Sequence, residues 1–208
     1  MGRYLKAILV LGLIVPACDA FVCSQQRIKA IEIANKGVEA FKNNLYDSAE
    51  RELRLSIQTD PTYEMAYYNL GKVYQKQRKW DKAIDAFEGA AQRSPSNANF
   101  QYDLGEAYLE AKHLDKAETA LKKATELDPK LFKAQWRLGL VYVFEERPKE
   151  ADVALRNAID NEEIDMASEI TALFGPLERL VETPARTLVG FVENLTGVAL
   201  TRAGRGGA

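Results

Sequence analysis

Small and apolar side chains recur along this chain at helical spacing, and the pattern repeats every 34 residues. Each unit carries a glycine, an aromatic residue three positions later in three of the units, and an alanine twelve positions after the glycine. The repeated small residues are Gly37, Gly71, Gly105 and Gly139 with Ala49, Ala83, Ala117 and Ala151. Apolar positions three and four residues apart form one buried stripe per helix. The pattern predicts four helix pairs over residues 30–63, 64–97, 98–131 and 132–165.

Helix start and stop signals lie between these predicted helices. The side chains predicted to cap the second helix of a unit are Asp47, Asp81 and Asp115. Those predicted to cap the next unit, each followed by a proline, are Asp60, Ser94 and Asp128. In the fourth unit we expect Pro148 in the turn between the helices.

The 34-residue period, with leucine-glycine, a tyrosine one turn later, alanine and a closing proline, resembles the tetratricopeptide repeat (TPR) family. The resemblance implies an all-α, right-handed solenoid of four helix pairs with a capping helix and short additional helices. It also implies a binding scaffold rather than a catalyst. In TPR proteins the first helices of the repeats line a concave groove.

The resemblance assigns a partner-binding groove to residues on the first helices of the second, third and fourth repeats. These residues are Tyr68, Asn69, Lys72, Tyr102, Asp103, Glu106, Lys133, Trp136, Arg137 and Phe144. We expect the aromatic side chains to supply affinity through apolar burial, and Lys133, Arg137 and the opposing acids to set the direction of the bound segment. Alternatively, Trp136 and Phe144 are covered by the C-terminal helices. A chaperone-type carboxylate clamp does not fit, because Tyr68, Lys72 and Asp103 stand where that clamp has Lys, Asn and Asn.

The first 23 residues have the layout of a secretory signal. Arg3 and Lys6 precede an apolar run over 7–15, which ends in small residues. The segment Val15-Pro16-Ala17-Cys18 resembles a bacterial lipobox, which implies lipidation of Cys18. Two alternatives remain open: cleavage after Ala20 without a lipid, or retention of residues 7–23 as a short membrane anchor. Each alternative exports the repeats.

The chain after the fourth repeat follows a different pattern. A helix over residues 164–174 is predicted to cap the last helix pair, and residues 166–200 form this cap and a helical arm. The arm either packs on the last repeat or acts as a partner-binding arm, a membrane-surface helix or an occupant of the chain's own groove. The segment 201–208 is rich in glycine and other small residues and is predicted to be disordered.

Composition excludes several classes of function. The net charge of −2 offers no basic field for nucleic acid. The only cysteines, Cys18 and Cys23, lie outside the repeats, so we expect packing rather than disulfides to hold the fold, and no metal or cofactor. The single histidine, His113, is predicted to be a solvated turn residue, and no convergent set of titratable groups predicts catalysis.

These features predict a non-enzymatic protein-interaction scaffold on the periplasmic side of a bacterial membrane, held there by lipid. Such a chain resembles the TPR lipoproteins that assist envelope assemblies, including pilotins. Two alternatives stay open: a permanent non-catalytic subunit of a membrane-associated enzyme complex, or a scaffold that self-associates.

Overall fold

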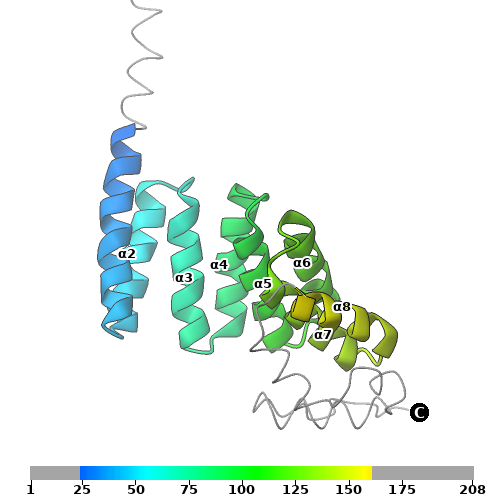
Figure 1. The fold of residues 1–208 in the computed structure, drawn as a ribbon. Helices are drawn as coiled ribbons and strands as arrows, with labels where there is room; N and C mark the ends of the chain where they lie inside the picture. The colour runs from blue at the N-terminus through cyan, green and yellow to red at the C-terminus, as the bar shows by residue number, and fades with distance from the viewer. Residues whose placement is uncertain (1–23, 161–208) are drawn as a thin grey trace, which may run out of the picture. The chain divides into compact units, whose positions relative to one another are not determined.

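The computed structural model describes residues 24–160, and every regular element in this range is an α-helix (Figure 1). A first helix over 24–42 precedes α2 (Tyr46–Thr59), α3 (Glu64–Lys76), α4 (Trp80–Arg93), α5 (Ala98–Glu110), α6 (Leu114–Leu127), α7 (Phe132–Phe144) and α8 (Pro148–Asp160). The helices fall into the pairs that the 34-residue period predicts, so the all-α helical-repeat fold is confirmed. The predictions for the signal segment with Cys18, the capping helix, the arm and the tail concern residues outside this range.

The chain divides after Ser94 into two compact units. Unit 1 contains the first helix, α2, α3 and α4; unit 2 contains α5, α6, α7 and α8. In unit 1, α3 packs against both α2 and α4. In unit 2, α7 packs against α6 and α8 and also contacts α5. Two first helices of successive repeats, α5 and α7, are therefore neighbours within unit 2.

The repeat glycines allow the two helices of a pair to approach closely. A Cβ atom at Gly105 of α5 would lie 2.6 Å from Cγ of Leu121 on α6, and one at Gly71 of α3 would lie 2.5 Å from the ring of Phe87 on α4. Leu121 and Phe87 are completely buried. Glycine is required here because any side chain would overlap the core residue of the partner helix.

Each first helix ends in the same hydrogen-bonded turn, and its residue with positive φ is not glycine. The residues with φ between 56° and 65° are Asn44, Arg78, Lys112 and Glu146, again 34 residues apart. After α3, the Lys79 amide donates to the Tyr74 carbonyl at 2.9 Å, and the Arg78 amide donates to the Gln75 carbonyl at 3.0 Å. This is the Schellman pattern, which satisfies carbonyls at the helix end.

The predicted caps of the second helices are wrong. The three aspartates are each the second residue of their helix and lie in its first turn: Asp47 in α2, Asp81 in α4 and Asp115 in α6. Lys79 occupies the N-cap position of α4, but its side chain makes no hydrogen bond to the helix start. The acids still favour the helix, because a negative charge in the first turn interacts well with the helix dipole.

The predicted caps before the prolines are also wrong. Asp60, Ser94 and Asp128 end the preceding helices instead of beginning the next. The Asp60 carboxylate accepts a hydrogen bond from the Thr62 amide at 2.8 Å, so it stabilises the turn around the proline. A true side-chain cap is Asn97, which accepts from the amides of Asn99 and Phe100 at the start of α5. Pro148, expected in a turn, is the first residue of α8, where proline is favoured.

No helix within residues 24–160 combines the length and the apolar character that crossing a membrane requires.

Candidate functional site

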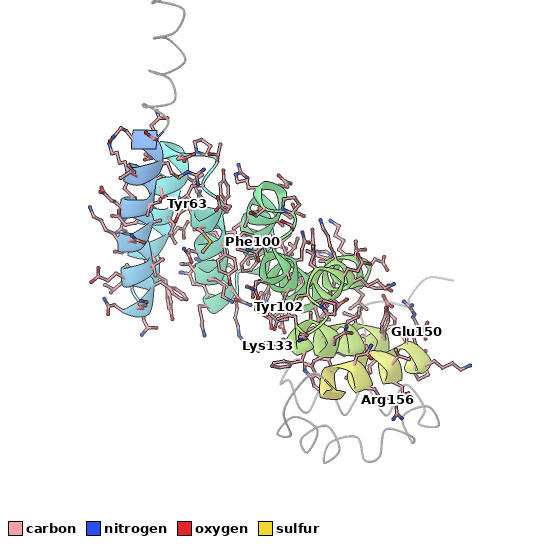
Figure 2. All side chains as sticks on the ribbon, turned by 45° about the horizontal axis from the view of Figure 1, so that its top comes forward. Tyr63, Phe100, Tyr102, Lys133, Glu150 and Arg156 are labelled. Atoms are coloured by element: carbon pink, nitrogen blue, oxygen red, sulfur yellow. The ribbon has the colours of Figure 1, made fainter. Side chains whose placement is uncertain are left out.

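The predicted site residues of unit 2 lie on α5 and α7, and two of them form an ion pair between these helices. Arg137 of α7 donates from Nη2 to Oε1 of Glu106 on α5 at 2.5 Å. Tyr102, one turn before Glu106 on α5, shares a hydrogen bond with Arg137. Figure 2 labels Tyr102 of α5 and Lys133 of α7. We call the surface formed by Tyr102, Asp103, Glu106, Lys133, Trp136 and Arg137 the α5/α7 face.

Burial and charge set the ionisation of this cluster. Burial, with the added negative charge of Glu106, raises the pKa of Tyr102 to about 12. Burial lowers the pKa of Arg137, but the Glu106 carboxylate and the Tyr102 hydroxyl outweigh this and leave that pKa above its ordinary value. Arg137 is therefore a cation and Tyr102 a neutral phenol throughout the physiological pH range.

The other residues of the α5/α7 face differ in exposure. Asp103 is 3% exposed, so it contributes almost no accessible surface to this face. Lys133 is exposed and forms no ion pair within residues 24–160, and its amine lies 5.8 Å from the centre of the Phe132 ring. Trp136 is half-buried, as is Phe144 at the end of α7. Arg137 thus pairs with Glu106, one of the opposing acids of the prediction, and the predicted role of Lys133 and Arg137 in setting the direction of a bound segment stays a prediction.

The predicted residues of unit 1, Tyr68, Asn69 and Lys72, lie half-buried on α3. The ring of Tyr68 lies 5.9 Å from that of Phe87, centre to centre, at an interplanar angle of 50°. Tyr68 therefore packs partly against the core aromatic of α4, and its predicted contact with a partner stays a prediction.

Sequence reasoning missed a polar role for the tyrosines that pack between repeats. The Tyr74 hydroxyl donates to Oε1 of Glu50 at 2.8 Å and accepts from Nη2 of Arg54 at 2.8 Å. Glu50 and Arg54 are one turn apart on α2, so they form an ion pair that also holds the tyrosine. The signal was present in the sequence as an acid and a base four residues apart.

Unit 2 repeats this arrangement at Tyr142. Glu118 and Lys122 form an ion pair on α6 at 2.7 Å, and both hydrogen-bond the Tyr142 hydroxyl. Arg147 lies over the Tyr142 ring at 4.4 Å and pairs with Glu118 at 3.1 Å. These contacts join α6 to α7 and stabilise the repeat seam, so we assign them to the fold.

Two cavities lie away from the predicted site. One of about 430 Å³ in unit 1 is lined by Arg54, Ile57, Gln58, Tyr67, Leu70, Tyr74, Lys82, Asp85 and Ala86. One of about 330 Å³ in unit 2 is lined by Gln135, Leu138, Tyr142, Lys149, Glu150, Val153, Ala154 and Asn157. None of the predicted groove residues lines either cavity. The two cavities occupy corresponding places in the second and fourth repeats, which marks them as features of the repeat architecture.

A metal site has no support in the residues that the structure describes. Between residues 24 and 160, no group of three or more His, Cys, Asp or Glu side chains could hold a metal ion. His113 is exposed at the start of α6, and its ring meets that of Tyr108 edge-on at 6.3 Å. The arrangement of the α5/α7 face is suited to binding rather than to proton transfer.

Comparison with known proteins agrees with the helical-repeat fold. The family model of the cilia and flagella-associated protein 70 C-terminal domain, a TPR model, matches residues 28–167. No curated protein matches the sequence. Among solved structures, a crystal structure of MamA is 26% identical, with 67% of this chain and 81% of that chain covered and a TM-score of 0.62.

Two further solved structures show the same fold at lower identity. YrrB, described as a TPR protein with an unusual peptide-binding site, is 19% identical, with 82% of this chain and 88% of that chain covered and a TM-score of 0.63. The first TPR of Spaghetti (RPAP3), bound to the HSP90 peptide SRMEEVD, is 23% identical, with 57% and 94% covered and a TM-score of 0.55. At these identities the likeness concerns the fold alone.

Proposed function

The chain belongs to the TPR family of the cilia and flagella-associated protein 70 C-terminal domain, and from that membership we propose that it is a non-enzymatic scaffold for protein–protein interaction. The scaffold binds a segment of a partner protein on the first helices of its repeats. The same fold hosts different ligands, so the residues of the site determine which segment is bound.

The observation that carries the proposal is the composition of the α5/α7 face. Tyr102 and Trp136 place half-buried aromatic rings on neighbouring helices, and Glu106 and Arg137 add polar groups beside them. Aromatic anchors next to arginine are the residues that contribute most to protein interfaces. Further support comes from RPAP3 and YrrB, which share the fold and are described with a peptide or a peptide-binding site.

We further propose that the scaffold works in the bacterial cell envelope as an assembly factor. The basic, apolar and small-residue parts of residues 1–23 support export, and the lipobox-like segment before Cys18 supports lipid anchoring on the periplasmic side of a membrane. Only five residues separate Cys18 from Ser24, the first of the helical residues that the structure describes. A lipid on Cys18 would therefore hold the repeats close to the membrane surface.

Partner capture tests the interaction surface. We would cross-link the protein in cells, purify it and identify partners by mass spectrometry, comparing the wild type with the Tyr68→Ala, Tyr102→Ala, Trp136→Ala variant. A matched control is Leu55→Ala with Val153→Ala, because these apolar residues are 47% and 59% exposed on second helices. We expect the control to keep the partner and the aromatic variant to lose it. A partner that survives in the aromatic variant would refute the proposed surface.

The stoichiometry of the captured complex separates two versions of the scaffold. A weak, exchangeable partner is expected of an assembly factor. A stoichiometric partner that resists high salt would instead make the protein a permanent subunit.

Metabolic labelling with a fatty acid tests the anchor. The expected result is a labelled protein whose mass corresponds to a mature chain that begins at Cys18. The label should be lost in Cys18→Ser and kept in Cys23→Ser. An unlabelled protein that begins at Phe21 would refute lipid anchoring and leave the interaction proposal intact.

A further inference from the structure

Arg137, one of the two cations of the α5/α7 face, is already neutralised within unit 2. The Arg137 guanidinium contacts the Glu106 carboxylate and shares a hydrogen bond with Tyr102. The side chains of the pair are 25% and 14% exposed, so little of either charge reaches solvent. A ligand carboxylate could reach Arg137 only by displacing Glu106.

The charges around the pair add to this barrier. Three acids, Asp103, Glu106 and Glu110, lie on α5, and two bases, Lys133 and Arg137, lie on α7. Over the whole of α5 and α7 the acids exceed the bases by one, whereas the α5/α7 face itself carries two of each. Asp103 is close enough to contribute to the raised pKa of Tyr102, so its field reaches the centre of the cluster. A second carboxylate placed here would be repelled, and like charges at an interface discriminate strongly between ligands.

Apart from the exposed amine of Lys133, the groups of the face that a ligand can contact are apolar or uncharged. Tyr102 is a neutral phenol, and Trp136 presents an indole on the neighbouring helix. A segment with apolar side chains gains contact area with these rings and leaves the ion pair undisturbed.

We propose that Glu106 is a specificity-determining residue, which holds Arg137 in place of a ligand carboxylate so that the α5/α7 face binds apolar, uncharged segments and rejects acidic ones. The inference rests on the proposed function, because it names the chemistry of the partner segment. It distinguishes this face from a surface that captures an acidic tail.

Peptide selection on the full chain tests the inference without a known partner. A random 12-residue display library would be selected against the wild type, Glu106→Gln and Glu106→Asp. We expect peptides enriched on the wild type and on Glu106→Asp to be depleted in Asp and Glu, and those enriched on Glu106→Gln to be rich in them. Because the wild-type arm needs no substitution, it tests the preference for uncharged segments even if a variant folds poorly, and the Glu106 variants test the role of that residue.

A defined acidic probe gives a second readout. The labelled peptide SRMEEVD, added to the full chain and followed by fluorescence anisotropy, should bind Glu106→Gln at least about tenfold more tightly than the wild type, since a freed guanidinium forms strong charge-assisted bonds. The Glu106→Gln, Arg137→Gln double variant should lose this gain. Far-UV circular dichroism would verify that each variant is folded.

The outcomes separate the inference from the function on which it rests. Acidic peptides enriched on the wild type, or equal SRMEEVD binding by the wild type and Glu106→Gln, would overturn the specificity role and keep peptide binding. Enrichment of no peptide, or enrichment that survives Tyr102→Ala with Trp136→Ala, would refute binding at this face and with it the inference.

Discussion

Replacing Gly105 with alanine tests whether close approach of α5 and α6 holds unit 2 together. The added Cβ would lie 2.6 Å from Cγ and 2.9 Å from Cδ2 of Leu121, and 3.2 Å from the Leu121 backbone nitrogen. Leu121 is completely buried. The branch carbon and the backbone cannot move aside as a side-chain tip could, so we expect strain at the upper end of the range for overpacked cores.

The strain of overpacking and the gain in helix propensity change the free energy of unfolding in opposite directions. Overpacking of this kind costs about 3 kcal/mol, and glycine to alanine inside a helix returns about 1 kcal/mol of helix propensity. We therefore expect Gly105→Ala to lower the free energy of unfolding by about 2 kcal/mol. Leu121→Ala alone should cost about 3 kcal/mol, because it leaves a cavity.

The double variant supplies the decisive measurement. With Leu121 truncated, the methyl group introduced by Gly105→Ala enters vacated space, so this substitution becomes stabilising by about 1 kcal/mol and the two substitutions couple by about 3 kcal/mol. Urea denaturation would be followed by Trp136 fluorescence in a Trp80→Phe background, so that the signal reports unit 2. Additive costs in the double variant, or a neutral Gly105→Ala, would refute the steric explanation.

Three further predictions test the turns, the seam and the site. Arg78→Gly should raise the stability of the protein by about 0.5–1 kcal/mol in urea denaturation, because glycine adopts the positive φ freely, whereas Arg78→Ala should change little. Tyr74→Phe should cost about 1–2 kcal/mol in the same assay, since two hydrogen bonds to Glu50 and Arg54 are lost; an unchanged midpoint would contradict this role. The pKa of Tyr102 in the folded protein is raised from 10.0 to about 12, so its neutral phenol stabilises the fold fully below pH 10, and this contribution disappears as the pH rises toward 12. In an alkaline titration followed by tyrosine absorbance, the ionisation phase near pH 12 should be missing from Tyr102→Phe.

The helix pairs were predictable because burial imposes a strict pattern on the sequence. Gly105 of α5 faces Leu121 of α6 at close range, so small and large apolar residues recur at fixed positions of each repeat. The ends of the helices were less predictable. An aspartate near a helix start serves equally well as a cap or in the first turn, so Asp81 fits both positions and the sequence alone does not decide between them.

The sequence predicted on which helices the candidate site residues lie, but not which side chains contact one another. The repeat register places Arg137 and Glu106 on first helices, yet it does not say that a side chain of one repeat pairs with the previous repeat. Opposite charges at repeat position nine of one unit and position six of the next would have been the signal. The packing of Tyr68 on Phe87 was missed for the same reason, because it depends on side-chain direction across two helices.

The turn after each first helix is held by main-chain hydrogen bonds rather than by the identity of its left-handed residue. Asparagine, arginine, lysine and glutamate all occupy that position, and all four side chains are exposed. The charge of the protein's surface at these points is therefore free to change while the helix pairs stay as they are. For an experimenter, these four positions are attachment points, one per repeat, where a fluorophore or surface tether would report on the scaffold with little disturbance of its core.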